Sequence, residues 1–236
     1  MLSGKVKWFN YKKGYGFITP EEGDKDVFVH ITAMREAQLK RLDEGQDIAY
    51  ELKEFREILA PLGYEILGAD DVGLTDCEET GQTFYENSFQ KAKHAVLQTG
   101  LPTLADDSGL CIHALDNQPG IFSARFAQQN GGYPAVFDVI WQKLEPFSDW
   151  SAHFNCCLCL LKPENTEKPL YFEGQVDGHI TKDKDDSMDK FGYDPIFVPD
   201  GYDRPFGGLS KDVKNQLSHR ARALEKLVAY LKLDNR

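Results

Sequence analysis

Two pairs of adjacent carboxylates are the residues of this sequence best suited to chemistry. Glu78 and Glu79 stand in the motif CEETG, just ahead of a segment with a helical pattern. Asp106 and Asp107 end an apolar run in ADDSG and meet a Ser-Gly turn. Hard oxygen ligands of this kind suit Mg²⁺. Neighbouring carboxylates at a strand end also raise each other's pKa, so one of them could act as a general base. Acid pairs are also common in turns of acidic proteins, so each pair alone is weak support for a metal site.

A third cluster with potential chemistry is the run FGYDPIF. Phe191 and Tyr193 could sandwich a flat ring, Gly192 would permit close approach of the backbone, and Asp194 could accept hydrogen bonds from ring N–H groups. The alternative is a buried turn of core aromatics.

A fourth cluster is basic and lies in KNQLSHRARALEKL. On a single helix Lys214, Ser218 and Arg222 are four residues apart, and His219 and Arg220 extend the basic edge. Grouped positive charges in an acidic segment suggest a phosphate clamp, and ordinary helix surface charge is the alternative. Taken together, acids for a metal, bases for phosphate and aromatics for a ring indicate a nucleotide site.

The composition limits what else the chain can do. The 236 residues carry a formal net charge of −11, which excludes a surface uniformly suited to polyanions. Any nucleic-acid contact must be local, and residues 1–13 hold four lysines and no acid. Five cysteines without a zinc pattern are interpreted as small buried thiols. Their odd number, with no signal peptide and no apolar run near membrane-spanning length, predicts a cytoplasmic protein without membrane contact.

The first fifty residues are predicted to form short strands over residues 4–10, 14–20, 26–32 and 47–52, as in a small antiparallel barrel. Aromatic side chains alternate along these strands and are interleaved with lysines. Such a pattern predicts a platform on which bases stack while lysines contact the backbone of a single strand; the alternative is an aromatic core. The residues concerned are Lys7, Trp8, Lys13, Tyr15, Phe17, Phe28 and His30.

Residues 3–52 resemble a cold shock domain, an OB-type barrel that binds single strands, and KGYGFI and VFVHI match its two RNA-binding motifs. The resemblance implies that single-stranded RNA or DNA binds at the seven residues of the platform. That family continues with a Gly-rich turn and a fifth strand. Neither follows here, so residues 1–51 are predicted to be a truncated domain of this type.

From residue 52 onward helical and strand patterns alternate, which predicts an α/β fold with helices packed on a sheet. The segment 83–100 is predicted to be a long helix, opened by Thr83 with Glu86 three residues later and ended by Gly100. The other predicted elements are a helix over 55–63, strands over 64–69, 154–162 and 170–180, and one closing helix from 210 or 211 to 233.

Four motifs in this part, EETGQTFYENSFQKA, LPTLADDSGLCIHALDNQPGIFSARF, FGYDPIF and SHRARALEKL, resemble the inosine triphosphate pyrophosphatase family. The resemblance covers residues 52–233. It implies a mixed-sheet α/β domain over residues 52–236 that acts as a homodimer. It also implies Mg²⁺-dependent hydrolysis of ITP, dITP and XTP to monophosphate and pyrophosphate.

The resemblance also implies roles for individual residues. Glu79 and Asp107 would hold Mg²⁺, with Asp107 also activating the water, and Lys91 and Ser108 would line the phosphate and metal site. The remaining substrate-binding residues would be Phe191, Gly192, Tyr193 and Asp194 for the base, and Lys214, His219 and Arg220 for the base oxygen and the phosphates.

The sequence departs from this family at the start of the α/β part. The family's Ser/Thr-x-Asn-x-x-Lys phosphate loop is replaced by GQDIAYE, and Glu51 falls where the lysine belongs. An acid in place of a phosphate-binding cation predicts reduced turnover. Three readings stay open: an active pyrophosphatase, a nucleotide- or single-strand-binding fusion without turnover, and an engineered or misassembled join. We also predict that residues 47–52 leave the barrel and serve as the missing first strand of the larger sheet.

Overall fold

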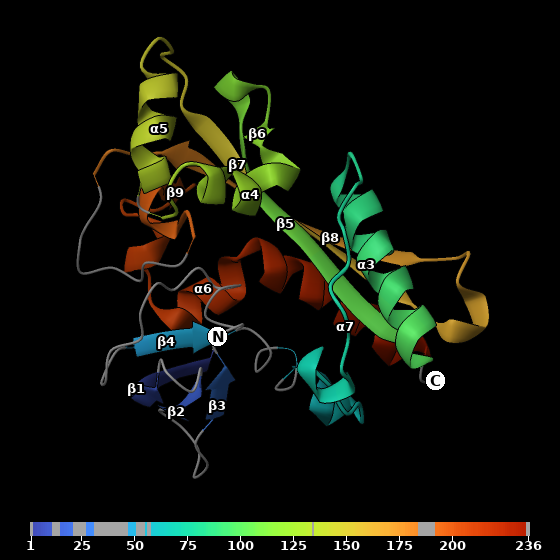
Figure 1. Ribbon diagram of the computed structural model, residues 1–236. Helices are drawn as coiled ribbons and strands as arrows, with labels where there is room; N and C mark the ends of the chain where they lie inside the picture. The colour runs from blue at the N-terminus through green and yellow to red at the C-terminus, as the bar shows by residue number, and fades with distance from the viewer. Residues whose placement is uncertain are drawn as a thin grey trace. The chain divides into compact units, whose positions relative to one another are not determined.

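The computed structural model describes residues 2–10, 15–20, 27–30, 47–50, 55, 58–133, 135–183 and 192–234. The chain divides into two compact units, Met1–Asp71 and Val72–Arg236 (Figure 1).

The first unit contains a four-stranded antiparallel sheet. Its order is β3 (Val27–His30), β2 (Tyr15–Pro20), β1 (Leu2–Asn10) and β4 (Asp47–Tyr50), which confirms the four predicted strands.

The register of this sheet sets the predicted stacking residues opposite one another. Trp8 of β1 pairs with Phe17 of β2, and Phe17 pairs with Phe28 of β3. Tyr15 pairs with His30 in the same way. The paired positions Trp8, Phe17 and Phe28 therefore form one row across three strands. The stacking role remains a prediction, and Lys13 lies outside the described residues.

Strand β4 belongs to the small sheet. Gly4 pairs with Ile48, and Leu2 pairs with Tyr50. The prediction that this strand joins the larger sheet is therefore wrong for the residues described. The backbone hydrogen bonds of Asp47–Tyr50 are made with β1, and the amphipathic pattern could not tell which sheet would supply that partner.

The segment after β4 is less regular than predicted. Residues 55, 58 and 59 are helical, and a 3₁₀ turn, η1 (Ala60–Leu62), ends at Gly63 with a left-handed φ of 88°. The predicted strand over 64–69 is wrong, because none of these residues forms a strand. A strand requires a neighbour to accept its backbone hydrogen bonds, and an alternating pattern does not provide that neighbour.

The second unit is built on a five-stranded sheet in which every pair is antiparallel. The order is β6 (Gln118–Pro119), β5 (Thr103–Ile112), β7 (Ser151–Leu161), β8 (Leu170–Ile180) and β9 (Phe197–Pro199). Helices pack on this sheet, which confirms the predicted α/β class.

Helix α3 (Phe84–Thr99) covers part of one face of this sheet, and β5 runs beside it (Figure 1). As predicted, the Thr83 hydroxyl caps the helix by accepting from the Glu86 N–H at 3.1 Å. The helix ends at Gly100, whose φ is 69°. Ala92 and Val96 of α3 pack against Cys159 of β7.

The opposite face carries the main apolar core. Buried residues of β7 and β8 such as Phe154 and Val176 pack with α4 (Ser123–Gln129) and α5 (Ala135–Leu144). The five cysteines are free thiols, and the four within the sheet are buried, as the sequence predicted. For Cys77 that prediction is wrong, because this residue is only partly buried.

The predicted single closing helix is wrong, because it is two helices, α6 (Lys211–Leu217) and α7 (His219–Asp234). Ser218 separates them with φ −60° and ψ 153°, and its hydroxyl accepts from the Ala221 N–H at 3.1 Å. Serine favours such a capping position over a helix interior because its hydroxyl satisfies a free N–H of the first turn. Lys214 and Arg222 therefore do not share one helix face.

Short 3₁₀ turns complete the second unit and its boundary. They are η2 (Asp70–Val72), η3 (His113–Leu115), η4 (Gly120–Phe122), η5 (Pro163–Asn165), η6 (Asp194–Ile196) and η7 (Phe206–Gly208). None of the helices described has both the length and the apolar composition needed to cross a bilayer.

Helix α7 lies against β8 at Gly174, where only glycine fits. A Cβ placed there would be 1.9 Å from the His219 carbonyl oxygen and 2.6 Å from the Ala223 nitrogen. We predict that Gly174→Ala lowers the free energy of unfolding by about 2 kcal/mol or more, because backbone atoms must move apart. Urea denaturation measures the change. Exposed Gln175→Ala on the same strand is the control, and equal stability of the two variants would contradict the close packing.

Candidate functional site

Asp106 and Asp107 lie within β5, and no turn follows them there. The prediction that they end a strand is wrong: the strand continues to Ile112. Consecutive strand residues point to opposite faces of a sheet, so the two carboxylates do not form one acid pair. Asp107 bonds to residues of α3, whereas Asp106 bonds to a residue of α7.

The first cluster, which we call the carboxylate–lysine cluster, consists of Glu79, Lys91 and Asp107. Lys91 Nζ lies 2.9 Å from Asp107 Oδ1 and 3.1 Å from Glu79 Oε1. Arg125 Nη2 lies 3.4 Å from Glu79 Oε2, which supplies a second cation. The structure thus brings together three residues that the sequence predicted for one metal and phosphate site.

The electrostatics of this cluster follow from burial and charge pairing. The side chain of Asp107 is 7% exposed. Its burial raises the pKa of the carboxyl above the usual value, although the Lys91 charge opposes that rise. Burial lowers the pKa of Lys91, but the carboxylates of Asp107, Asp106 and Glu79 together more than offset this, so the pKa is raised overall and the ammonium stays charged.

Asn87 belongs to this cluster and was missed by the sequence reasoning. It is fully buried on α3, donates from Nδ2 to Asp107 Oδ2 at 3.3 Å, and accepts from the Gly81 N–H at 2.9 Å. It therefore ties the loop that carries Glu79 to strand β5. An amide four residues before Lys91, on the same face of the helix, was the available signal.

The second cluster lies on the other face of β5 around Asp106. Its Oδ2 accepts from Arg220 Nη2 at 3.1 Å and Nε at 3.3 Å, and from the Ser108 hydroxyl at 3.0 Å. Burial raises the pKa of Asp106, but the cations of Arg220 and Lys91 outweigh it and the net pKa is lowered. Of the predicted phosphate residues, Ser108 and Arg220 therefore meet here, away from Asp107.

His219 opens α7 beside this second cluster. Its ring stacks on Phe154 with centroids 4.9 Å apart and an interplanar angle of 14°. Its buried Nδ1 has no hydrogen-bond partner within the part of the chain that the structure describes. Burial lowers its pKa from 6.5 to about 3, with the Arg220 charge adding to the shift.

The predicted base-binding run is divided in the structure. The Tyr193 side chain is buried, donates from its hydroxyl to the Ser123 carbonyl at 2.8 Å, and packs edge-on against Tyr133. Tyr193 thus takes the core arrangement that the sequence left open as the alternative. Gly192 has a left-handed φ of 54°, and Asp194 Oδ2 lies 2.8 Å from Lys214 Nζ. Phe191 lies outside the described residues.

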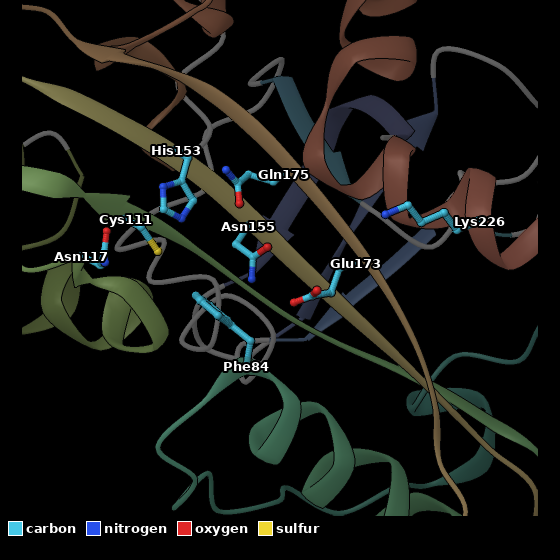
Figure 2. Close-up of a pocket in the computed structure, with 8 residues that line it drawn as sticks. All are labelled: Phe84, Cys111, Asn117, His153, Asn155, Glu173, Gln175 and Lys226. Atoms are coloured by element: carbon cyan, nitrogen blue, oxygen red, sulfur yellow. The ribbon is translucent and has the colours of Figure 1, made fainter.

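A polar cavity of about 510 Å³ opens on the sheet. Figure 2 shows Phe84, from the start of α3, among polar side chains of the strands. Its lining contains none of the predicted site residues and consists of Phe84, Cys111, Asn117, His153, Asn155, Glu173, Gln175 and Lys226. Within the described residues no three His, Cys, Asp or Glu side chains are grouped as a metal site.

Fold and site together define an α/β protein with acidic and basic side chains clustered on both faces of its long strand β5. A family model described as "Ham1 family" matches residues 50–230, and one described as "'Cold-shock' DNA-binding domain" matches residues 2–57. The chain belongs to the Ham1 family.

Individual relatives agree with this assignment. A protein of Coxiella burnetii named dITP/XTP pyrophosphatase is 41% identical over 182 residues, covering 76% of this chain and 90% of that protein. A solved structure of a HAM1 protein from Coxiella burnetii has a TM-score of 0.71 at 40% identity and covers 77% of this chain and 93% of its own. The Staphylococcus aureus Ham1 structure gives 0.71 at 35% identity, with 78% and 93% covered. Both predicted resemblances are confirmed.

His219 makes the stability of the second unit dependent on pH. Its folded-state pKa lies below the unfolded value of 6.5, so the unfolded chain binds the proton more readily. Above pH 6.5 the imidazole is neutral in both states and does not reduce the free energy of unfolding. As the pH falls from 6.5 toward 3, protonation of the unfolded chain lowers that free energy. We expect His219→Gln to remove up to about 1.4 kcal/mol per pH unit from the slope of unfolding free energy in that window. Denaturant unfolding at several pH values tests this, and parallel slopes would contradict it.

Proposed function

We propose that this chain hydrolyses non-canonical purine nucleoside triphosphates, such as ITP, dITP and XTP, to the monophosphate and pyrophosphate with Mg²⁺. The observation that carries the proposal is the carboxylate–lysine cluster, in which Glu79 and Asp107 converge on one cation. Support also comes from the similarity to proteins named dITP/XTP pyrophosphatase.

The donor set of this cluster fits Mg²⁺. Two carboxylate oxygens lie 2.9 and 3.1 Å from the same nitrogen, so both are within reach of one cation between them. Mg²⁺ prefers such hard oxygens, needs only one or two carboxylates, and keeps waters and substrate phosphates as its other ligands. Glu79 and Asp107 would hold the ion, which would supply charge neutralisation at the phosphates.

The protein's own residues would do the rest of the chemistry. Asp107 would accept the proton of the attacking water as the general base. Lys91 would contact the phosphates as a charged donor. Ser108, which lies on the Asp106 face of β5, would act there beside Arg220.

The base would be selected on the other side of β5. Phe191, Gly192 and Asp194 would hold the ring, with the backbone at Gly192 close to it, and Tyr193 would support this turn from the core. A 6-oxo purine accepts a hydrogen bond where adenine donates one, so donors from Lys214, His219 and Arg220 would favour hypoxanthine and xanthine.

Two further features belong to the proposal. The active form would be a cytoplasmic homodimer. The absence of an Asn and a Lys at the expected phosphate loop would reduce turnover, and Glu51 would repel the triphosphate. A binding fusion without turnover is the second candidate, favoured by this same departure.

An assay of pyrophosphate release tests the proposal. We expect the protein with Mg²⁺ to release pyrophosphate from ITP and dITP well above background. Asp107→Asn should lower kcat by about 100-fold or more, because a general base is lost. Asp203→Asn, whose side chain is exposed, is the matched control and should retain the wild-type rate. Wild-type activity no higher than that of Asp107→Asn would leave the binding fusion as the better account.

The small sheet would bind single-stranded RNA or DNA through its aromatic row. We expect Phe17→Ala and Phe28→Ala each to weaken binding of a single-stranded oligonucleotide by roughly 1–3 kcal/mol, since each removes a stacked base contact. Fluorescence anisotropy with the full chain measures the affinity. If both variants bind as tightly as the wild type, these rings belong to a core.

A further inference from the structure

Lys91 is the shared partner of two carboxylates that come from different elements. Its Nζ contacts Asp107 Oδ1 on β5 and Glu79 Oε1 in the loop before α3. We call Asp107 Oδ1 and Glu79 Oε1 the inner oxygens, and Asp107 Oδ2 and Glu79 Oε2 the outer oxygens. The outer oxygens have other donors, Asn87 for Asp107 Oδ2 and Arg125 for Glu79 Oε2. The two inner oxygens therefore share one cation, the Lys91 ammonium.

Within this cluster the aspartate is fixed and the lysine can move. Asp107 is 7% exposed, and its outer oxygen is held by Asn87, which is itself fully buried and bonded to Gly81. Lys91 is 26% exposed, and its ammonium sits at the end of a flexible four-carbon stem. A change of cation between the carboxylates would thus be accommodated by the lysine.

An ammonium and a divalent cation would compete for the two inner oxygens. A Mg²⁺ ion lies about 2 Å from the oxygens that bind it. An ammonium held between the same two carboxylates would lie close to the ion, and the two positive charges would repel each other strongly. Resting on the metal-dependent function proposed above, we propose that Lys91 and a divalent cation exchange between Glu79 and Asp107. The ammonium neutralises the carboxylates when no metal is bound, and the arriving cation displaces it toward solvent.

This exchange gives Lys91 two successive partners. Without metal it offsets the repulsion between Glu79 and Asp107, which keeps the loop before α3 bound to β5. After displacement the ammonium is free to meet an anionic group such as a phosphate. The same charge would therefore weaken metal binding and strengthen substrate binding, a combination that a lysine placed only for phosphate would not produce.

Metal titration without nucleotide tests the exchange. We expect Lys91→Met to bind Mn²⁺ about tenfold more tightly than the wild type, or better, because no ammonium competes for the carboxylates. Lys93→Met is the matched control: Lys93 lies on the same helix, is 38% exposed and pairs with Glu167 at 3.3 Å. It should bind Mn²⁺ like the wild type. Isothermal titration or electron paramagnetic resonance measures the affinity, and equal or weaker binding by Lys91→Met overturns the proposal.

Thermal stability gives a second readout. In EDTA, Lys91→Met should melt about 5 °C or more below the wild type, because two carboxylates lose their shared cation. Added Mg²⁺ should raise its Tm more than that of the wild type. Lys91→Gln removes the same charge and is measured in parallel, so that failure of one variant to fold leaves the test intact. A charge-neutral variant with wild-type Tm in EDTA and the wild-type response to Mg²⁺ overturns the exchange.

These measurements separate the exchange from the proposed activity. Tighter Mn²⁺ binding by Lys91→Met in a protein that releases no pyrophosphate would support the exchange and refute the activity. Normal pyrophosphate release with unchanged Mn²⁺ affinity in Lys91→Met would support the activity and refute the exchange.

Discussion

The second unit depends on one constraint: two consecutive carboxylates of strand β5 each need a cation on their own face of the sheet. Asp107, almost fully buried, meets Lys91 of α3, and Asp106 meets Arg220 of α7. A carboxylate removed from water is tolerated only when charges and hydrogen bonds replace its hydration. Helices α3 and α7 are therefore each bonded to one of two adjacent residues of β5, so a displacement of that strand would alter both charge clusters.

In this arrangement acidic and basic side chains form close ion pairs, and a bound substrate could replace one partner of such a pair. Glu79 and Asp107 share Lys91, and Asp194 holds Lys214. Each cation predicted to contact phosphate or base is, in the structure, already bonded to a carboxylate. Binding of a nucleotide with its metal would replace these internal pairs by external ones, so affinity would depend on the difference between two sets of ion pairs.

Strand β4 lies close in sequence to the start of the Ham1 family match. Asp47–Tyr50 completes the small sheet by pairing with β1, so it is not available as a first strand for the larger one. The Ham1 family match begins at residue 50, the last residue of this strand, and the cold-shock match extends to residue 57. The chain thus passes from a segment that matches the cold-shock model into one that matches the Ham1 family model.

Local patterns in the sequence determined the elements whose signals are contained in neighbouring residues. The cap at Thr83, the stop at Gly100 and the strands β7 and β8 were predicted because capping groups and alternating burial act over a few residues. Tertiary structure alone decided the partners. It placed Asp106 and Asp107 on opposite faces of β5, brought buried Asn87 to the carboxylate–lysine cluster and assigned β4 to the small sheet. Such pairings join residues far apart in the chain, and the free energy of a buried charge depends on where its partner lies in space.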